Sequence, residues 1–221
     1  MTYPEFLAVH GMRLLDGAFV TVQQTILASV VAVLIALAVG MMRLSSNPLV
    51  HGTATVYIEI FRGTSLLVQL FWIFFVLPLF GITLEKFTAG FLAVGMNLGA
   101  YGAEVVRGAI QAVPRGQYEA ALALNLSPAQ RMRRIILPQA LLIMLPPWGN
   151  LFIELLKATA LVALISVTDL MFQAKQINGY TFLSVEAFGS ALVIYYVMAR
   201  FAVTPGMRWL ERYTARRLGR D

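Results

Sequence analysis

The chain has 221 residues, of which 59% are hydrophobic and 13% charged, and its net charge is +6. This composition excludes an ordinary water-soluble domain and indicates an integral membrane protein of one domain. The absence of cysteine excludes disulfides and thiol catalysis, and the wide separation of His10 and His51 argues against a histidine metal site. We attribute the positive charge to basic residues in loops, which set the orientation of the protein in the membrane, and not to a nucleic-acid-binding surface.

Five apolar stretches predict an all-α protein with five transmembrane helices. Residues 1–16 lack the features of a signal peptide and are expected to lie at the membrane interface. Glu59 and Arg62 precede the second span and are placed at or below the inner interface. The predicted spans are residues 17–42, 64–80, 87–110, 138–157 and 186–204.

The third span has two distinct faces at 100° per residue. One face carries three glycines, which favour close helix packing: Gly95, Gly99 and Gly102. The opposite face carries three polar side chains: Asn97, Tyr101 and Glu104. Because polar groups are costly at membrane depth, this face is expected to be part of a solute path, with interhelical hydrogen bonds as the alternative. An ion pair with Arg107 would also account for Glu104.

A polar and basic island at residues 115–137 separates two apolar blocks and predicts two short helices at an angle. Ser127 is expected to cap the second helix and Pro128 to occupy its first position. Three arginines place the island on the cytoplasmic side: Arg131, Arg133 and Arg134. Composition alone equally allows an amphipathic loop that lies on the lipid surface.

The spacing within this island resembles the EAA loop of ABC-importer permeases. The matching residues are Glu119, Ala120, Ala121, Asn125, Ile135, Leu137 and Pro138. The family usually has glycine where this chain has Asn125, and asparagine is the best substitute at a left-handed backbone position. The resemblance continues in YGAEVVRGAIQAVP, LPPWGN and LLKATALVALI, and it points to permeases of the polar-amino-acid type.

Beyond the island, the apolar run to about residue 172 contains Pro146-Pro147, which predicts a helix broken near mid-membrane. Asn150, Glu154 and Lys157 follow on one helix face. Transporters use broken helices to bind solutes at depth, so these three residues are further solute-path candidates. A structural kink with an internal Glu154–Lys157 ion pair is the alternative.

The resemblance implies the type I ABC importer transmembrane fold for residues 17–210, followed by a basic cytoplasmic tail at residues 211–221. It also implies that the loop is a coupling helix seated in a groove of a separate ATPase, with Glu119 and its neighbours receiving the motion. The implied partners are two copies of the ATP-binding subunit, a second permease that is identical or homologous, and an extracytoplasmic solute-binding protein. The sequence contains no P-loop, so we expect no cofactor in this chain, with ATP and Mg bound by the partner ATPase.

Lysine and arginine concentrate in the island and the tail, which predicts an inner-membrane protein with its N-terminus outside and its C-terminus inside. The loop sequence ALNLS resembles that of ectoine and hydroxyectoine importer permeases, and this suggests the solute. The competing class is an ion-gradient-driven secondary transporter or a small channel, which a broken helix with internal charges would also suit.

Overall fold

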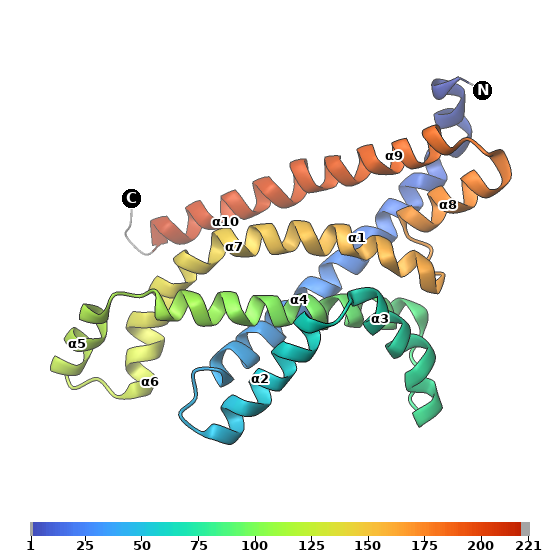
Figure 1. Cartoon of the computed structure of the whole chain (residues 1–221). Coiled ribbons are helices and arrows are strands. Elements are labelled where there is room, and N and C mark those ends of the chain that lie inside the picture. Colours follow the sequence, from blue (N-terminus) through green and yellow to red (C-terminus); the bar gives the residue numbers. More distant parts are fainter. Residues whose placement is uncertain (1, 218–221) are drawn as a thin grey trace.

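The computed structural model describes residues 2–217, and its regular elements are all helical within that range (Figure 1). The elements in chain order are α1 (Tyr3–Met42), α2 (Pro48–Gly63), α3 (Leu66–Phe71), η1 (Trp72–Val76), η2 (Leu77–Phe80), α4 (Lys86–Gln111), α5 (Arg115–Ala123), α6 (Pro128–Arg131), η3 (Met132–Ile136), α7 (Leu137–Ala158), η4 (Thr159–Ile165), α8 (Leu170–Thr181), α9 (Ser184–Val197), η5 (Met198–Val203) and α10 (Thr204–Arg217). The prediction of an all-α fold is therefore confirmed.

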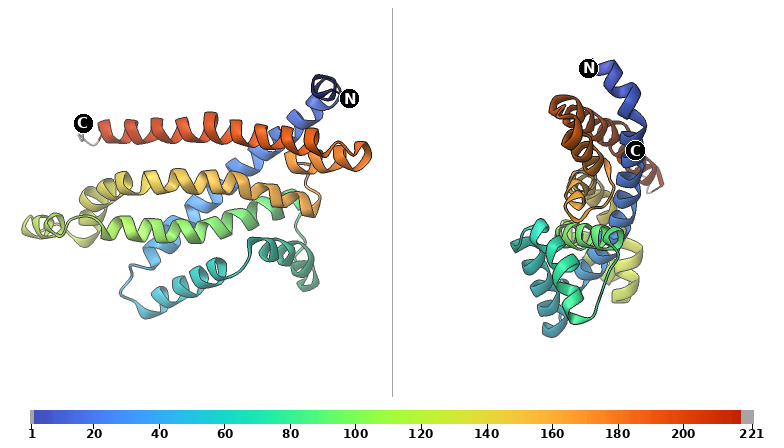
Figure 2. Two further views of the ribbon diagram at one scale, coloured as in Figure 1. Left: turned by 45° about the horizontal axis from the view of Figure 1, so that its top comes forward. Right: turned by 90° about the vertical axis from the view of Figure 1, so that its right-hand side faces the viewer.

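Four continuous helical stretches are long and apolar enough to span a membrane, and a bent pair of helices supplies a fifth. The four are Tyr3–Met42, Lys86–Gln111, Pro128–Ile165 and Ser184–Arg217, and the bent pair is Pro48–Gly63 with Leu66–Phe80. In Figure 2, α4, α7 and the α9–α10 stretch lie side by side, and α1 crosses them obliquely. The five predicted spans thus all correspond to apolar helical stretches.

The glycine face of α4 packs closely against another helix, as predicted, and the partner is α1. A Cβ atom added to Gly95 would lie 2.7 Å from Cβ of Val31, and one added to Gly102 would lie 2.7 Å from the ring of Trp148 in α7. These distances are shorter than van der Waals contact, so the helix backbones approach as closely as they do only because the side chains are absent. The three helices α1, α4 and α7 form the core that positions the remaining elements.

We expect Gly95→Ala to destabilise the protein, because the new methyl group overlaps Val31 and the helices must separate. Overpacking of this kind costs about 1–3 kcal/mol. Gly108→Ala on the same helix is the matched control, since a Cβ atom there meets nothing within 4 Å and alanine is the better helix former. Thermal unfolding in detergent measures the effect, and equal melting temperatures for the two variants would contradict the packing.

Helix α1 runs without interruption for 40 residues from Tyr3 and so continues across the boundary predicted at residue 17. The helix begins early because the backbone N–H of Thr2 donates to the Glu5 carboxylate at 2.8 Å and proline occupies the first turn. Gly17 lies inside the helix against the backbone of α8, where an added Cβ would approach Leu170 to 2.9 Å.

The second span also differs from its predicted bounds. The helix begins at Pro48, and residues 64–80 form only the second limb of a pair bent by 105°. Thr64 has an extended backbone after Gly63 and ends α2. The sequence could not show that side chains from other elements would cap the carbonyl groups freed at this bend.

The predicted break at Pro146-Pro147 is wrong, because α7 is a continuous helix through both prolines. The two proline rings are exposed, whereas Trp148 is buried against α4 and α10. Packing along one side of the helix therefore maintains its direction although two backbone hydrogen bonds are lost.

The last span is longer than predicted. It continues into α10, so residues 211–217 of the predicted tail are helical, and residues 218–221 lie outside the described residues.

Candidate functional site

The short helices α5 and α6 lie at one end of the helix bundle (Figure 1). The chain turns between them at Asn125, whose φ of 51° is left-handed, as expected for a residue in place of glycine. Ser127 then caps α6: its hydroxyl accepts from the backbone N–H of Gln130 at 3.3 Å, and its own N–H donates to the Gln130 side chain at 3.0 Å. The predicted two-helix loop with this cap is confirmed.

The loop is fixed to the bundle on one side and open on the other. Tyr118 donates its hydroxyl to the carbonyl of Ile110 at 3.0 Å, and burial raises the pKa of Tyr118. Ala121 is buried, whereas Glu119 and Ala120 are exposed. Among the described residues both ion pairs involve Glu104, so the Glu119 carboxylate is available to a partner.

The remaining loop candidates anchor the junction with α7. Ile135 packs on the core formed around Ile136, which is fully buried. Leu137 and Pro138 are half-buried and start α7. The seven coupling candidates thus differ in environment: Glu119, Ala120 and Asn125 are exposed, Ala121 is buried, and Ile135, Leu137 and Pro138 are half-buried at the start of α7.

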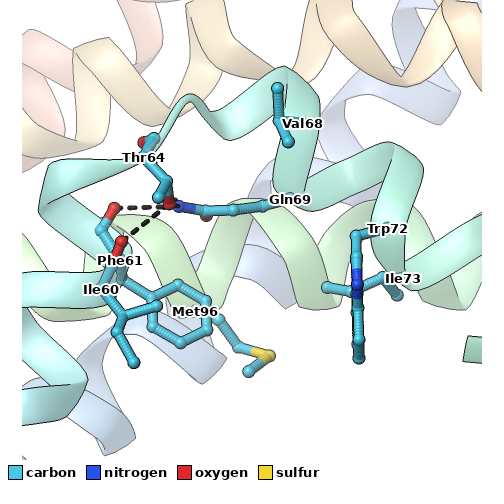
Figure 3. A pocket seen from close by; sticks show the side chains of 8 residues that line it. All are labelled: Ile60, Phe61, Thr64, Val68, Gln69, Trp72, Ile73 and Met96. Atoms are coloured by element: carbon cyan, nitrogen blue, oxygen red, sulfur yellow. Dashed lines mark hydrogen bonds between the residues drawn. The ribbon is translucent and has the colours of Figure 1, made fainter. Parts of the chain in front are cut away.

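Asn97 holds the bend between α2 and α3. Its side-chain amide donates to the carbonyl of Phe61 at 2.9 Å and to Oε1 of Gln69 at 3.0 Å. Gln69 in turn donates to Phe61 at 3.0 Å and to Thr64 Oγ1 at 2.7 Å (Figure 3). The two bonds to Phe61 satisfy a carbonyl group that the bend leaves without a helical partner. Asn97 thus makes the interhelical hydrogen bonds that were the alternative to a solute path.

A hollow of about 370 Å³ opens beside this bend (Figure 3). Apolar side chains such as Ile60, Trp72 and Met96 line most of it. The hollow contains none of the solute-path candidates, and its chemistry suits lipid chains better than a polar solute.

Tyr101 and Glu104 lie one turn apart on α4 and contact three arginines. The guanidinium of Arg62 lies 5.2 Å from the ring centroid of Tyr101. Glu104 pairs with Arg107 at 2.7 Å, as predicted, and with Nε of Arg43 at 3.6 Å. The cluster is cationic overall, because a single carboxylate faces these side chains.

No role was predicted from the sequence for Arg43, which follows the first span. Its Nη1 donates to Nε2 of His51 at 2.7 Å and to Thr55 Oγ1 at 2.8 Å, while Nδ1 of His51 lies 2.9 Å from the Arg43 carbonyl oxygen. The i, i+4 spacing of His51 and Thr55 on one helix face was a signal, but it did not reveal the partner.

Asn150, Glu154 and Lys157 lie on one exposed face of α7, as predicted. The alternative of an internal Glu154–Lys157 pair is wrong, because neither side chain takes part in an ion pair within the described part of the chain. Lys157 instead borders a hollow between α7 and α9 that Tyr195 and Tyr196 also line. Both charges are therefore free to meet a solute or another subunit.

The structure does not join the two groups of solute-path candidates within one chain. Helices α4 and α7 meet where Gly102 faces Trp148, and Trp148 is about 200° around α7 from Asn150. No hydrogen bond or ion pair connects the α4 group with the α7 group over residues 2–217. A path that uses both groups would need the contribution of a second subunit.

Long apolar helices, an exposed two-helix loop and the lack of a nucleotide-binding motif in the sequence define a membrane subunit of a transporter whose energy source lies elsewhere. The family of binding-protein-dependent transport system inner membrane components matches residues 18–216, and the chain belongs to this family. Its members are the permease subunits of ABC importers, so ATP hydrolysis takes place on a separate subunit.

Individual relatives agree with this assignment. The chain is 48% identical over 207 residues to a probable amino-acid ABC transporter permease of Sinorhizobium fredii, covering 87% of each protein. It is 36% identical over 201 residues to the glutamine transport system permease GlnP of Escherichia coli, covering 90% of this chain and 91% of that protein.

Solved structures confirm the type I ABC importer fold. An amino acid ABC transporter crystallised with histidines matches with a TM-score of 0.88 and 37% identity over 96% of this chain and 99% of that one. The methionine transporter MetNI, in an inward-facing conformation, shares the fold with a TM-score of 0.80 at 20% identity, over 97% of this chain and 99% of its own. The resemblance drawn from the EAA loop is thus confirmed at the level of the family, and the competing class of secondary transporter or channel is not supported.

Proposed function

We propose that this chain forms the membrane path of an ATP-driven, binding-protein-dependent importer for a polar amino acid or an amino-acid-like compatible solute. The exposed two-helix loop carrying Glu119 is the observation that supports this proposal most directly, because a family member needs such a surface to meet its ATPase. The complete importer would hold two permeases, identical or homologous, and two ATPase subunits that bind ATP and Mg. A solute-binding protein would dock on the outer side.

In this proposal, Glu119 and Ala120 contact the ATPase groove, and Ala121 and Asn125 maintain the shape of the loop. Ile135, Leu137 and Pro138 pass its displacement to α7. The exposed leucines of the loop support this assignment: Leu122 and Leu124 are 54% and 72% exposed. Apolar side chains beside a free carboxylate are typical of a protein contact surface with a charged anchor.

The solute path is proposed to follow the exposed face of α7. Glu154 and Lys157 form no ion pair within residues 2–217 and offer both signs of charge, which suits a zwitterion with a cationic and an anionic end. Asn150 adds hydrogen-bonding capacity one turn away, and Tyr101 with Glu104 is assigned to the α4 side. Asn97 takes part only by holding the bend.

We further propose ectoine or hydroxyectoine as the solute, on the basis of the ALNLS and IELLKATALVALI segments. Uptake into proteoliposomes containing the assembled importer and its binding protein tests this assignment. Labelled ectoine should be taken up in preference to labelled glutamine and histidine. Preferential uptake of either amino acid would overturn the ectoine proposal but leave the importer proposal intact.

The proposed orientation can be tested by cysteine labelling. Because the chain has no cysteine of its own, a single introduced cysteine is the only site in it that reacts with a maleimide. In intact cells, cysteines at Ser127 and Thr214 should be shielded from an impermeant maleimide, and one at Thr83 should react. Ser127 and Thr83 are both exposed in the structure, so their difference in reactivity reports the side of the membrane. Labelling of position 127 from outside would overturn both the orientation and the proposed coupling role.

A further inference from the structure

Two adjoining hollows form one groove between α1, α7 and α10. One hollow measures about 500 Å³ and lies at the end of the bundle that carries the loop; the other measures about 200 Å³ and continues along α7. Both are lined by Leu37, Leu141 and Met144, so they are continuous. The combined size is within the range of small-ligand sites, which is about 300–1,000 Å³.

The groove has a basic end and an apolar body. Arg133 and Arg217 border the hollow at the loop end, together with the aromatic ring of Tyr213. No polar side chain contributes to the other hollow, whose lining includes Trp148 and Phe152. Neither arginine takes part in an ion pair with a carboxylate in the part of the chain that the structure describes.

The aromatic residues of α10 place this basic end at the level of the lipid headgroups. Trp209 and Tyr213 stack with ring centroids 5.4 Å apart and are 60% and 42% exposed, and Arg217 lies over Tyr213 at 4.9 Å. Tryptophan and tyrosine concentrate at the membrane–water interface, and a cation one turn beyond them reaches the phosphate layer. A free anion would use the two arginines alone and leave the apolar body empty.

The length of the groove also fits one leaflet. Between Leu137 and Phe152 the helix rises about 22 Å, at about 1.5 Å per residue. One leaflet with its headgroups is about 20–22 Å thick, which is half of the roughly 40–45 Å of a whole bilayer. The groove therefore runs from the headgroup layer to the middle of the membrane.

The groove is on the opposite side of α7 from the proposed solute path. Leu141 and Phe152 are about 140–180° around the helix from Asn150 and Glu154, at about 100° per residue. A ligand in the groove would thus contact α1, α7 and α10 without entering the path.

We propose that this groove binds an anionic phospholipid in the leaflet that holds the α5–α6 end of the chain, with the phosphate between Arg133 and Arg217 and an acyl chain along Leu141 and Trp148. The bound lipid would bridge the start of α7 to the end of α10. The site does not depend on the identity of the transported solute.

The test uses the assembled importer, delipidated in detergent and titrated with palmitoyl-oleoyl phosphatidylglycerol or phosphatidylcholine, with bound lipids counted by native mass spectrometry. The wild type should retain phosphatidylglycerol in preference to phosphatidylcholine. Arg133→Gln with Arg217→Gln should weaken phosphatidylglycerol binding by about fivefold for each arginine, or roughly 25-fold together, because each such charge contributes about 1 kcal/mol at an anionic surface. Phosphatidylcholine binding should change little.

Two further variants make the result specific. Arg134→Gln with Arg212→Gln removes the same charge from exposed positions that do not line the groove, and it should retain phosphatidylglycerol within about twofold of wild type. Leu141→Trp fills the groove and should reduce the binding of both lipids. Wild-type phosphatidylglycerol binding in the Arg133–Arg217 variant, or an equal loss in the control, would overturn the proposal. So would normal binding of both lipids by the assembled Leu141→Trp importer.

Discussion

Replacing Glu119 with lysine is expected to abolish transport-stimulated ATP hydrolysis while the chain still inserts into the membrane. Glu119 is exposed on α5 and has no ion-pair partner within residues 2–217, so the substitution breaks no described ion pair. Lysine is as good a helix former as glutamate, so α5 is retained. In the proposed contact, the Glu119 carboxylate meets a basic group in the ATPase groove. The lysine variant would place two positive charges together there, and the loss of such an interface pair costs about 2–5 kcal/mol.

The measurement is ATP hydrolysis in proteoliposomes with and without the loaded binding protein. A loss of about 3 kcal/mol corresponds to a roughly 150-fold weaker contact, which would leave only the unstimulated rate. Glu211→Lys on α10 is a control with the same change of charge and should retain stimulation. Normal stimulated turnover in Glu119→Lys would remove Glu119 from the coupling contact.

The double charge reversal of Glu154→Lys with Lys157→Glu is expected to eliminate nearly all uptake, while the importer still assembles and hydrolyses ATP. The swap keeps the net charge and the helix but inverts the field that α7 presents to a zwitterion. The structure strengthens this expectation because the two side chains are exposed and unpaired within the described residues, so they do not simply neutralise each other.

Smaller losses of solute uptake are expected for Asn150→Ala and Tyr101→Phe. Each substitution removes about one hydrogen bond to the solute, on the order of 1–2 kcal/mol. Glu85→Lys with Lys86→Glu is the matched control, because these residues are also exposed and carry the same charges at the start of α4. That swap should preserve uptake. Wild-type uptake in the Glu154–Lys157 swap would place these residues outside the path and leave the α4 side as the remaining candidate.

Features of the fold that depend on neighbouring residues in the sequence could be predicted. The Ser127 cap and the left-handed Asn125 follow from the chemistry of the loop itself, and the structure confirms both. The close packing of this face of α4 follows from the spacing of Gly95 and Gly99, because small residues on one helix face let helix backbones approach each other, but the spacing does not identify α1 as the partner.

Features that depend on distant partners could not be predicted. Helix α7 continues through its two prolines, and Trp148 beside them packs against Gly102 of α4, a contact that the sequence does not reveal. The 105° bend after α2 is held by Asn97 from a different helix. The sequence pattern therefore predicted a break in α7, where the helix is continuous and packed against its neighbours. It predicted a straight second span, where hydrogen bonds from other helices hold a bend.

The unbroken α1 has a mechanical consequence. Its 40 residues extend about 60 Å at about 1.5 Å per residue, roughly twice the 30 Å thickness of the hydrocarbon layer. Near its start, Tyr3 hydrogen-bonds Ser190 at 2.8 Å and Arg13 donates to Tyr180 at 2.7 Å, while at its far end Gly40 fits against Val106. Contacts with α8 and α9 near its start and with α4 near its end therefore lie on one uninterrupted helix. We expect a tilt of α1 at one of these contacts to displace the other, because no break in the helix lies between them.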